Sequence, residues 1–268
     1  TVSKDHDKES YFYSAGKPVH RTSYCAFLDV LGFSRRIQKS YQDGSKDALL
    51  ESFHEVITES VGRIREEADD YSMLYFKTFS DNVLLAHPKI SPDMESEFAF
   101  IMWSIKRYQL QMAIKGFFVR GGLSVDLLFM DENCIYGQAL LEAYKLEQEV
   151  AINPVVVLCD KSMALTRYHL KFYPDDSAPQ LRDVLKGPDG RYFLNYLTEC
   201  IAEGDDQDSL NASLLMAHRI QVEQALKTYE EDPRVLAKFS WLASYHNHFC
   251  DAVSQLDGYD PPLKISAP

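Results

Sequence analysis

The chain has 268 residues, 46% of them hydrophobic, and a formal net charge of −12. This charge disfavours non-specific binding of nucleic acid through a basic face, and no apolar run approaches the roughly 18 residues that a membrane-spanning helix needs. No N-terminal segment resembles a signal peptide. We therefore expect a cytoplasmic protein with no membrane or nucleic-acid partner, built on one large core or on a core with an appended helical unit.

The five cysteines are an odd number and include no Cys-x-x-Cys pair. The sequence therefore predicts neither disulfides nor a structural zinc site. Cys25 and Cys159 lie in apolar runs, where a small buried hydrophobic side chain fits.

The first 160 residues alternate between strand and helix patterns. Residues 1–20 are polar and without periodicity, which predicts a mobile arm. Apolar runs and three- and four-residue apolar spacings then predict, in order, a strand over 23–31, a helix over 45–69, a hairpin of strands 74–79 and 83–87, a helix over 92–116, a strand over 117–130, a helix over 138–151 and a buried strand over 154–159. Such alternation predicts an α/β (α+β) fold in which helices pack on a mixed sheet.

The pattern weakens after residue 160. A short strand is expected after the Pro-Asp-Gly turn at 188–190, and residues 207–256 fit two helices that are split near Asp232-Pro233, because Pro can occupy the first turn of a helix. The pair Gly121-Gly122 inside the strand over 117–130 predicts a bulge or a close backbone approach. We divide the chain into an arm (1–20), a main domain (21–200) and a C-terminal helical extension (201–268) that packs on the same core or on a dimer.

The run FLDVLGF, Phe27 to Phe33, carries one carboxylate, Asp29, inside an apolar strand that ends in a Gly turn. An unpaired buried carboxylate is destabilising by several kcal/mol. Asp29 is therefore expected to meet a cation, a metal ion or a cluster of backbone N–H groups, or else to cap the following turn.

A second carboxylate, Asp81, lies in FKTFSDNVLLA, where an apolar strand breaks at Ser80-Asp81-Asn82 and then resumes. A Ser/Asp/Asn cluster of this kind turns a hairpin. Two acidic residues at the ends of neighbouring strands form a site for a hard divalent cation, because carboxylates close together do not both stay ionised without one.

Four motifs in this order, FLDVLGF, KTFSDN, VRGGLS and IYGQALLEAYKLE, resemble the catalytic domain of class III nucleotide cyclases over about residues 24–160. The resemblance implies a cyclase-like mixed sheet and a site that holds two Mn²⁺ or Mg²⁺ ions. Asp29 and Asp81 would be catalytic metal ligands, with the Val30 carbonyl as a third. The N–H groups of the turn at Leu31–Ser34, which includes Phe33, would cradle phosphate oxygens.

The same resemblance assigns roles to residues further along the chain. Arg120 matches the phosphate-binding Arg of the family, since a guanidinium can grip two phosphate oxygens. Lys77 and Cys134 match the positions that read the base, and Lys145 matches a catalytic Arg. The family forms a head-to-tail homodimer with sites at the interface, so Lys77, Cys134 and Lys145 would come from the partner of the chain that supplies the two Asp residues.

This chain departs from the family pattern at two positions. Leu141 and Lys145 stand where the family usually has Asn and Arg. Lys offers a point charge where Arg offers a planar fork, so catalysis is expected to be weaker, to use another donor or to be absent. The pair Lys77 and Cys134 fits neither the adenine pattern (Lys with Asp) nor the guanine pattern (Glu with Cys), and leaves the base open.

Within the superfamily, the chain is most similar to the pyrimidine cyclases of bacterial Pycsar antiphage systems. The similarity includes FLDVLGFS, FSDN, YGQALLEAYKLE, DGRYFLNYL and a C-terminal region ending near WLASYHN. It implies a lyase that converts UTP, or CTP, into the 3′,5′-cyclic monophosphate and pyrophosphate, and that reaches its downstream effector only through the cyclic nucleotide. Two alternatives stay open: a purine (adenylate or guanylate) cyclase, and a catalytically inert dimer that binds a nucleotide.

Overall fold

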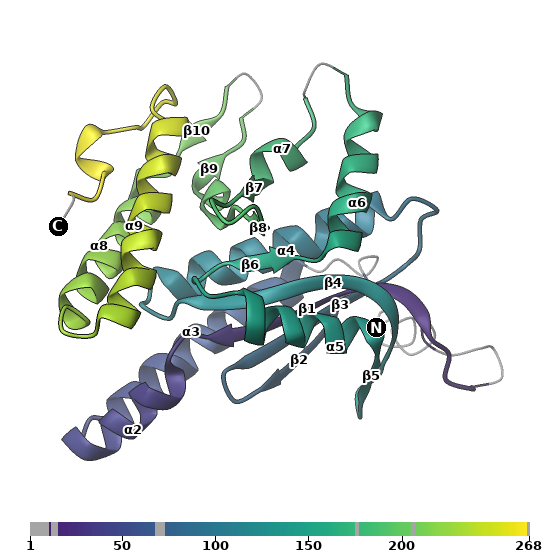
Figure 1. Ribbon diagram of the computed structural model, residues 1–268, viewed down its shortest axis with the longest axis horizontal. Coiled ribbons are helices and arrows are strands. Elements are labelled where there is room, and N and C mark those ends of the chain that lie inside the picture. The colour runs from purple at the N-terminus through teal and green to yellow at the C-terminus, as the bar shows by residue number, and fades with distance from the viewer. Residues whose placement is uncertain (1–10, 12–15, 68–72, 175–176, 205–206, 267–268) are drawn as a thin grey trace.

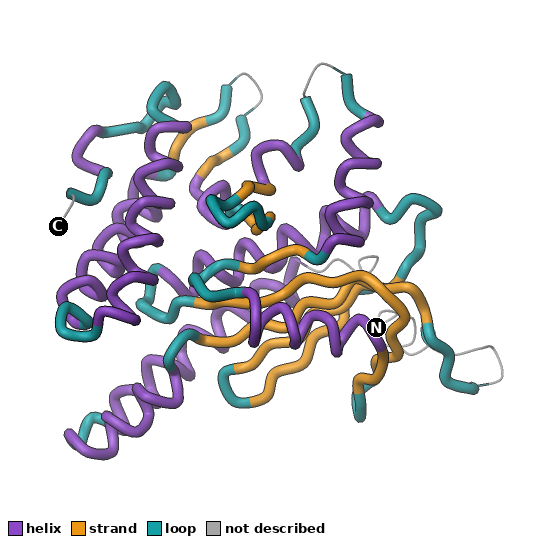
Figure 2. The backbone as a smooth tube through the Cα atoms, in the orientation of Figure 1, coloured by secondary structure: helices purple, strands orange, loops and turns teal. Residues whose placement is uncertain are grey.

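The computed structural model describes residues 11, 16–67, 73–174, 177–204 and 207–266. Its centre is a mixed sheet of eight strands with the order β2-β3-β1-β4-β6-β8-β7, in which β5 pairs with β4 (Figures 1 and 2). All the pairings are antiparallel except that of β4 with β6. The strands are β1 (Arg21–Val30), β2 (Tyr75–Phe79), β3 (Asn82–Pro88), β4 (Val119–Met130), β5 (Ile135–Gly137), β6 (Val156–Leu158), β7 (Val184–Lys186) and β8 (Tyr192–Leu194); β9 (Ile201–Ala202) and β10 (Ser209–Leu210) form a separate pair.

Helices cover both faces of this sheet, which confirms the predicted mixed α/β fold. They are α2 (Phe33–Asp43), α3 (Lys46–Glu67), α4 (Glu95–Ala113), α5 (Gln138–Lys145), the π-helix η1 (Leu146–Val150), α6 (Asp160–His169), α7 (Gln180–Asp183), α8 (Ala212–Thr228) and α9 (Pro233–Ala252), with 3-10 turns η2 (Leu170–Phe172), η3 (Tyr196–Cys200) and η4 (Pro261–Leu263). Within the described residues, no helix is long and apolar enough to cross a membrane.

The side chains of β1 alternate between the two faces of the sheet. Tyr24 and Leu28 point into the main core, which also contains buried residues of α3 and α4. Cys25 and Phe27 belong to a smaller cluster on the other face, with residues of α5. Because successive side chains of a strand point to opposite faces, Asp29 falls on the face of α5.

The glycine pair in β4 allows close packing of backbones. The β1–β4 register runs without interruption from Arg21 opposite Leu128 to Val30 opposite Val119, so this ladder contains no bulge. A Cβ atom at Gly122 would lie 2.4 Å from the Leu146 Cβ. The sequence predicted either a bulge or a close backbone approach here, and the structure shows the close approach. It allows α5 and η1 to pack directly on β4.

Several elements differ from the prediction. The structure adds α2 and α6; in α2 the apolar side chains that pack on the core are those of Phe33 and Ile37, one turn apart, and most of the other side chains are polar. The predicted helix over 138–151 is divided into α5 and η1. In the predicted arm, residues 1–10 and 12–15 lie outside the described residues, whereas Tyr11 is buried and its hydroxyl is 2.7 Å from the Ser23 Oγ. The last residues of the predicted helix over 45–69 also lie outside the described part.

The C-terminal helices α8 and α9 form an antiparallel pair beside the sheet (Figure 1). As predicted, they are split at Asp232-Pro233: the Asp232 carboxylate accepts a hydrogen bond from the Val235 N–H at 3.2 Å, and Pro233 lies in the first turn. Their buried side chains include His218 and His246, whose rings stack with centroids 5.1 Å apart. The two helices therefore share a second core with the segment that carries β8 and η3.

Candidate functional site

Asp29 is the next-to-last residue of β1 and stands between two cross-strand neighbours. Asn82 of β3 lies opposite it on one side and Arg120 of β4 on the other. Its side chain is 20% exposed, so it is accessible to a ligand but largely desolvated.

Asp81 lies in the tight turn between β2 and β3, directly before Asn82, as the sequence predicts. The preceding Ser80 adopts a positive φ of 57°, and its hydroxyl donates to the Asp81 Oδ1 at 3.0 Å. Because Asn82 is the cross-strand partner of Asp29, the turn brings the two carboxylates to the same end of the sheet.

The carboxylates at this end outnumber the cations that offset them. The pKa of Asp29 is raised from its ordinary value of 3.8 to about 7, first by burial and then by the negative charges of Glu147 and Asp81. The positive charge of Arg120 opposes this rise without cancelling it. The site therefore has uncompensated negative charge, which is the condition under which carboxylates bind a divalent cation.

The donor set fits a hard cation. Among the described residues, no group of three His, Cys, Asp or Glu side chains is arranged to hold a metal ion. Asp29 and Asp81 would therefore be completed by main-chain oxygen and water, which Mg²⁺ and similar ions accept. The side chain of Val30 is buried in the core, so only its carbonyl oxygen can serve as a donor.

Glu147 was not identified as a site residue from the sequence. It lies on η1 with a fully buried side chain, and its Oε1 is 2.6 Å from an Nη2 of Arg120, an ion-pair distance that lacks the alignment of a hydrogen bond. Arg120 also places its Nε 3.4 Å from the Asp29 Oδ2 and donates to the Ala151 carbonyl at 3.4 Å. Helical spacing puts Glu147 on the buried side of its helix, and a buried Glu needs a cation. These two facts together could have identified Glu147 from the sequence.

Tyr108 of α4 has a buried hydroxyl that is within electrostatic range of Asp81 and Asp29. Its side chain is 1% exposed, and within the described residues its hydroxyl has no hydrogen-bond partner. Burial raises its pKa, and the charges of Asp81 and Asp29 add to this effect. Sequence periodicity identified Tyr108 only as a core residue.

The turn after β1 leads directly into α2. Gly32 adopts a positive φ of 73° and precedes the first helical residue, and no side chain caps the N-terminus of α2. Phe33 itself is buried and packs on Phe53 with ring centroids 4.2 Å apart. Any contact of Phe33 with a ligand therefore involves its backbone N–H, because its side chain belongs to the core.

The other predicted site residues lie away from the carboxylates of the same chain. Lys77 lies in the middle of β2, and Lys145 is the last residue of α5. Lys77 contributes, as a minor cause after backbone hydrogen bonds led by that of Cys134, to lowering the pKa of Asp131. Cys134 is exposed in the turn between β4 and β5, and Lys145 is exposed on α5 with its Nζ 3.9 Å from a Glu149 oxygen.

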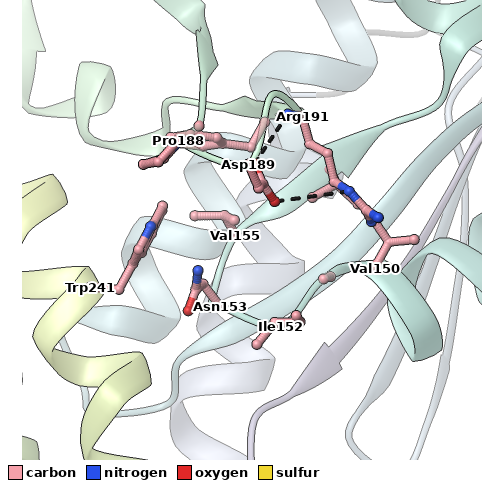
Figure 3. Close-up of a pocket in the computed structure, with 12 residues that line it drawn as sticks. Val150, Ile152, Asn153, Val155, Pro188, Asp189, Arg191 and Trp241 are labelled. Carbon is pink, nitrogen blue, oxygen red and sulfur yellow. Dashed lines mark hydrogen bonds and ion pairs between the residues drawn. The ribbon is translucent and has the colours of Figure 1, made fainter.

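A cavity of about 250 Å³ lies between the sheet and α9, apart from the carboxylates (Figure 3). Its walls are mostly apolar and include Trp241 and Phe193, while Asn153, Asp189 and Arg191 supply polar groups. Ala151 lines this cavity, and its carbonyl accepts a hydrogen bond from Arg120.

No known protein family matches the sequence, and a search of curated proteins found no relative. Among solved structures, the chain is similar to the guanylyl cyclase Cya2 (12% identity, 55% of this chain and 78% of that one, TM-score 0.40). It is also similar to the catalytic core of a rhodopsin-guanylyl cyclase with converted specificity, in complex with ATPαS (16% identity, 66% and 96%, TM-score 0.42). A third similar structure is a bacterial light-regulated adenylyl cyclase (12% identity, 67% and 92%, TM-score 0.37).

Proposed function

We propose that the protein is a metal-dependent nucleotide cyclase, which converts a nucleoside triphosphate into its 3′,5′-cyclic monophosphate and pyrophosphate. The observation that carries this proposal is the meeting of Asp29 and Asp81 at one end of the sheet, next to Arg120, with more negative charge than the site neutralises. The order of the four sequence motifs supports the same reading.

In the proposed reaction, the ribose 3′-hydroxyl attacks the α-phosphorus in line. The new bond joins O3′ to the α-phosphorus, the bond from the α-phosphorus to the bridging oxygen breaks, and the hydroxyl proton leaves to solvent or to a basic group of the site. Divalent cations held by Asp29 and Asp81 would supply the charge that lowers the pKa of the hydroxyl and neutralises the phosphates.

In this proposal, separate groups of the chain bind the cations and the phosphates. Asp29 and Asp81, with the Val30 carbonyl, would hold the cations. The Leu31 N–H of the predicted cradle donates to the Phe118 carbonyl, so the N–H groups of Gly32, Phe33 and Ser34 would receive phosphate oxygens, as helix N-termini do. Arg120 would grip two phosphate oxygens, and the buried ion pair with Glu147 keeps its guanidinium at this end of the sheet.

The full site requires a second copy of the chain in this proposal. Lys77, Cys134 and Lys145 would reach the nucleotide from the partner subunit, which gives two equivalent sites in a head-to-tail homodimer. Large apolar side chains are exposed on the elements that would meet there: Phe79 is 79%, Leu141 is 62% and Tyr144 is 48% exposed. A second copy would remove these side chains from water.

We propose UTP, or CTP, as the substrate and antiphage signalling as the role, on the resemblance to pyrimidine cyclases. A purine substrate is the alternative for the base. The inert nucleotide-binding dimer is favoured by the residue types at the usual Asn and Arg positions: Leu141 has no polar group, and the Lys145 ammonium lies 3.9 Å from a Glu149 oxygen.

Product analysis tests these proposals. Purified protein is incubated with Mn²⁺ and each of the four nucleoside triphosphates, and products are separated by chromatography with mass detection. We expect a cyclic monophosphate from UTP or CTP, and none after Asp29→Ala or Asp81→Ala with an unchanged circular dichroism spectrum. A cyclic purine would select the purine cyclase, and no cyclic product from any substrate would reject the cyclase in favour of the inert dimer.

A further inference from the structure

One lysine of the C-terminal helices lies beside the candidate site. Lys238 is half-buried on α9, one residue before Phe239. The ring of Phe239 packs against that of Phe118, with centroids 5.2 Å apart, and Phe118 lies two residues before Arg120. The Phe118 carbonyl accepts a hydrogen bond from the Leu31 N–H at 2.8 Å. This packing brings α9 to the place where β1 ends and β4 begins.

A second set of contacts joins the start of α9 to the turn before α2. Arg35, in the first turn of α2, donates to the Asp232 carboxylate at 2.7 Å, and the same carboxylate caps α9. Leu31 and Val235 pack against the same buried cluster. The first turns of α9 are therefore neighbours of the N–H groups that would receive phosphate oxygens.

Two cations, Arg120 and Arg234, act on Lys238, and the carboxylates of this region, Glu147 and Asp29, pair with Arg120. Burial lowers the pKa of Lys238, and the positive charges of Arg120 and Arg234 lower it further. No carboxylate of the described residues counters that effect. Arg234 lies four residues before Lys238 on the same helix face, where like charges are mutually unfavourable. A half-buried cation in such surroundings is stabilised when an anion binds.

We propose that Lys238, assisted by Arg234, binds the terminal phosphate groups of the nucleoside triphosphate, so that the C-terminal helices form part of the active site. The identity of the anion rests on the proposed cyclase function. An ammonium group suits this task because it is a compact charge that meets a single phosphate oxygen. Arg120 would then hold the phosphates from the sheet and Lys238 from α9.

The test measures binding of inorganic pyrophosphate with Mg²⁺ by calorimetry. The variants are Lys238→Met, the charge-conserving Lys238→Arg, and the matched control Lys227→Met, which removes an exposed lysine of α8. A charge-assisted contact predicts that Lys238→Met weakens binding roughly tenfold or more. Lys238→Arg should stay within about threefold of the wild type, and Lys227→Met should not differ from it.

Thermal unfolding without ligand separates binding from structure. Loss of an unpaired cation predicts that Lys238→Met unfolds at the wild-type temperature or above it, whereas a structural ion pair would lower that temperature. Unchanged pyrophosphate affinity in Lys238→Met, or no binding to the wild type, overturns the inference. If the affinity depends on Lys238 but the wild type forms no cyclic product, the anion site stands and the cyclase proposal fails.

The kinetic constants give a further readout in an active enzyme. We expect Lys238→Met to raise both the KM for the triphosphate and the inhibition constant of pyrophosphate by about tenfold, because both ligands carry the terminal phosphates. Binding of a nucleoside monophosphate, which lacks those groups, should not change. Equal weakening of monophosphate binding would contradict a contact with the terminal phosphates.

Discussion

The substitution Asp29→Asn should make the metal-free protein more stable at about pH 8 while it abolishes cyclase activity. The pKa of the Asp29 carboxyl is raised from 3.8 to about 7 by burial and by the charges of Glu147 and Asp81. The folded state therefore holds this proton more tightly than the unfolded state does. The resulting stability is complete below about pH 4 and is lost as the pH rises through 7. Asparagine resembles the protonated form at every pH.

The size of the effect follows from the same pKa. At about pH 8 the Asp29 carboxyl is ionised in both the folded and the unfolded protein. Because its pKa is about 7 in the folded state and 3.8 ordinarily, this ionisation lowers the free energy of unfolding by at most ~4 kcal/mol. The Asp29 side chain is 20% exposed, and allowing for solvent screening we expect about 2 kcal/mol. In a chain of this size that corresponds to a rise of roughly 5 °C in Tm.

Thermal unfolding in EDTA, at about pH 4 and about pH 8, measures this difference. The matched control is Asp126→Asn on β4, because Asp126 is paired with Lys161, which lowers its pKa. We expect Asp29→Asn to unfold well above the wild type at pH 8 and near it at pH 4, and Asp126→Asn to show no increase at pH 8. An Asp29→Asn protein that is less stable than the wild type at pH 8 would refute the conclusion that burial and the neighbouring carboxylates destabilise the ionised form of Asp29.

Four further results are expected. Asp81→Ala should remove the rise in Tm that Mn²⁺ gives the wild type, as measured by thermal unfolding with and without the ion; an undiminished rise would exclude Asp81 as a ligand. Lys106→Met should lower the free energy of unfolding in urea by about 3 kcal/mol, because it removes the buried ammonium group that lies closest to Asp183 and Glu199 and leaves them only the more distant Arg182 and Arg107. A loss below about 1 kcal/mol would show that these two arginines compensate for it. Gly122→Ala should destabilise the protein in the same assay, because the added Cβ would lie 2.4 Å from the Leu146 Cβ. Gly62→Ala has open space around it and should stabilise the protein by about 0.5–1 kcal/mol. Similar effects of the two substitutions would contradict this packing. His218→Gln should flatten the loss of stability between about pH 6.5 and 5, because burial lowers the pKa of His218 and only the unfolded state takes up a proton there; an unchanged slope would mean that the imidazole is protonated in the folded state as well.

The sequence predicted those parts of the fold that have a clear apolar pattern. The apolar run FLDVLGF and the break at Ser80-Asp81-Asn82 predicted β1 and the hairpin, because a strand covered on both faces is apolar along its length and turn residues interrupt it. Helix α2 was missed because only two of its apolar side chains, Phe33 and Ile37, pack on the core, which makes a short pattern in an otherwise polar segment. The glycine pair signalled a close approach, but only the structure shows that its partner is Leu146.

The candidate site was predictable only in part for a related reason. Asp29 was recognisable because a carboxylate in an apolar strand is unusual, and Asp81 because turn residues mark a hairpin. Glu147 and Lys238 are charged residues on helices, where a charge is most often solvated, and their surroundings depend on which helix packs on which strand. Tertiary packing, which periodicity along the chain does not encode, gives both residues their neighbours.

The proposed site draws on residues of β1 and of α9, which lie far apart in the sequence. Asp29 is among the first residues of the sheet to leave the ribosome, whereas α9 emerges about 200 residues later, a delay of roughly 10–40 s at ordinary rates of synthesis. A nascent chain that ends before Pro233 would contain both carboxylates and Arg120 but would lack Lys238. In the proposed site, Lys238 therefore joins the two carboxylates only after α9 has been synthesised and has packed beside β1 and β4.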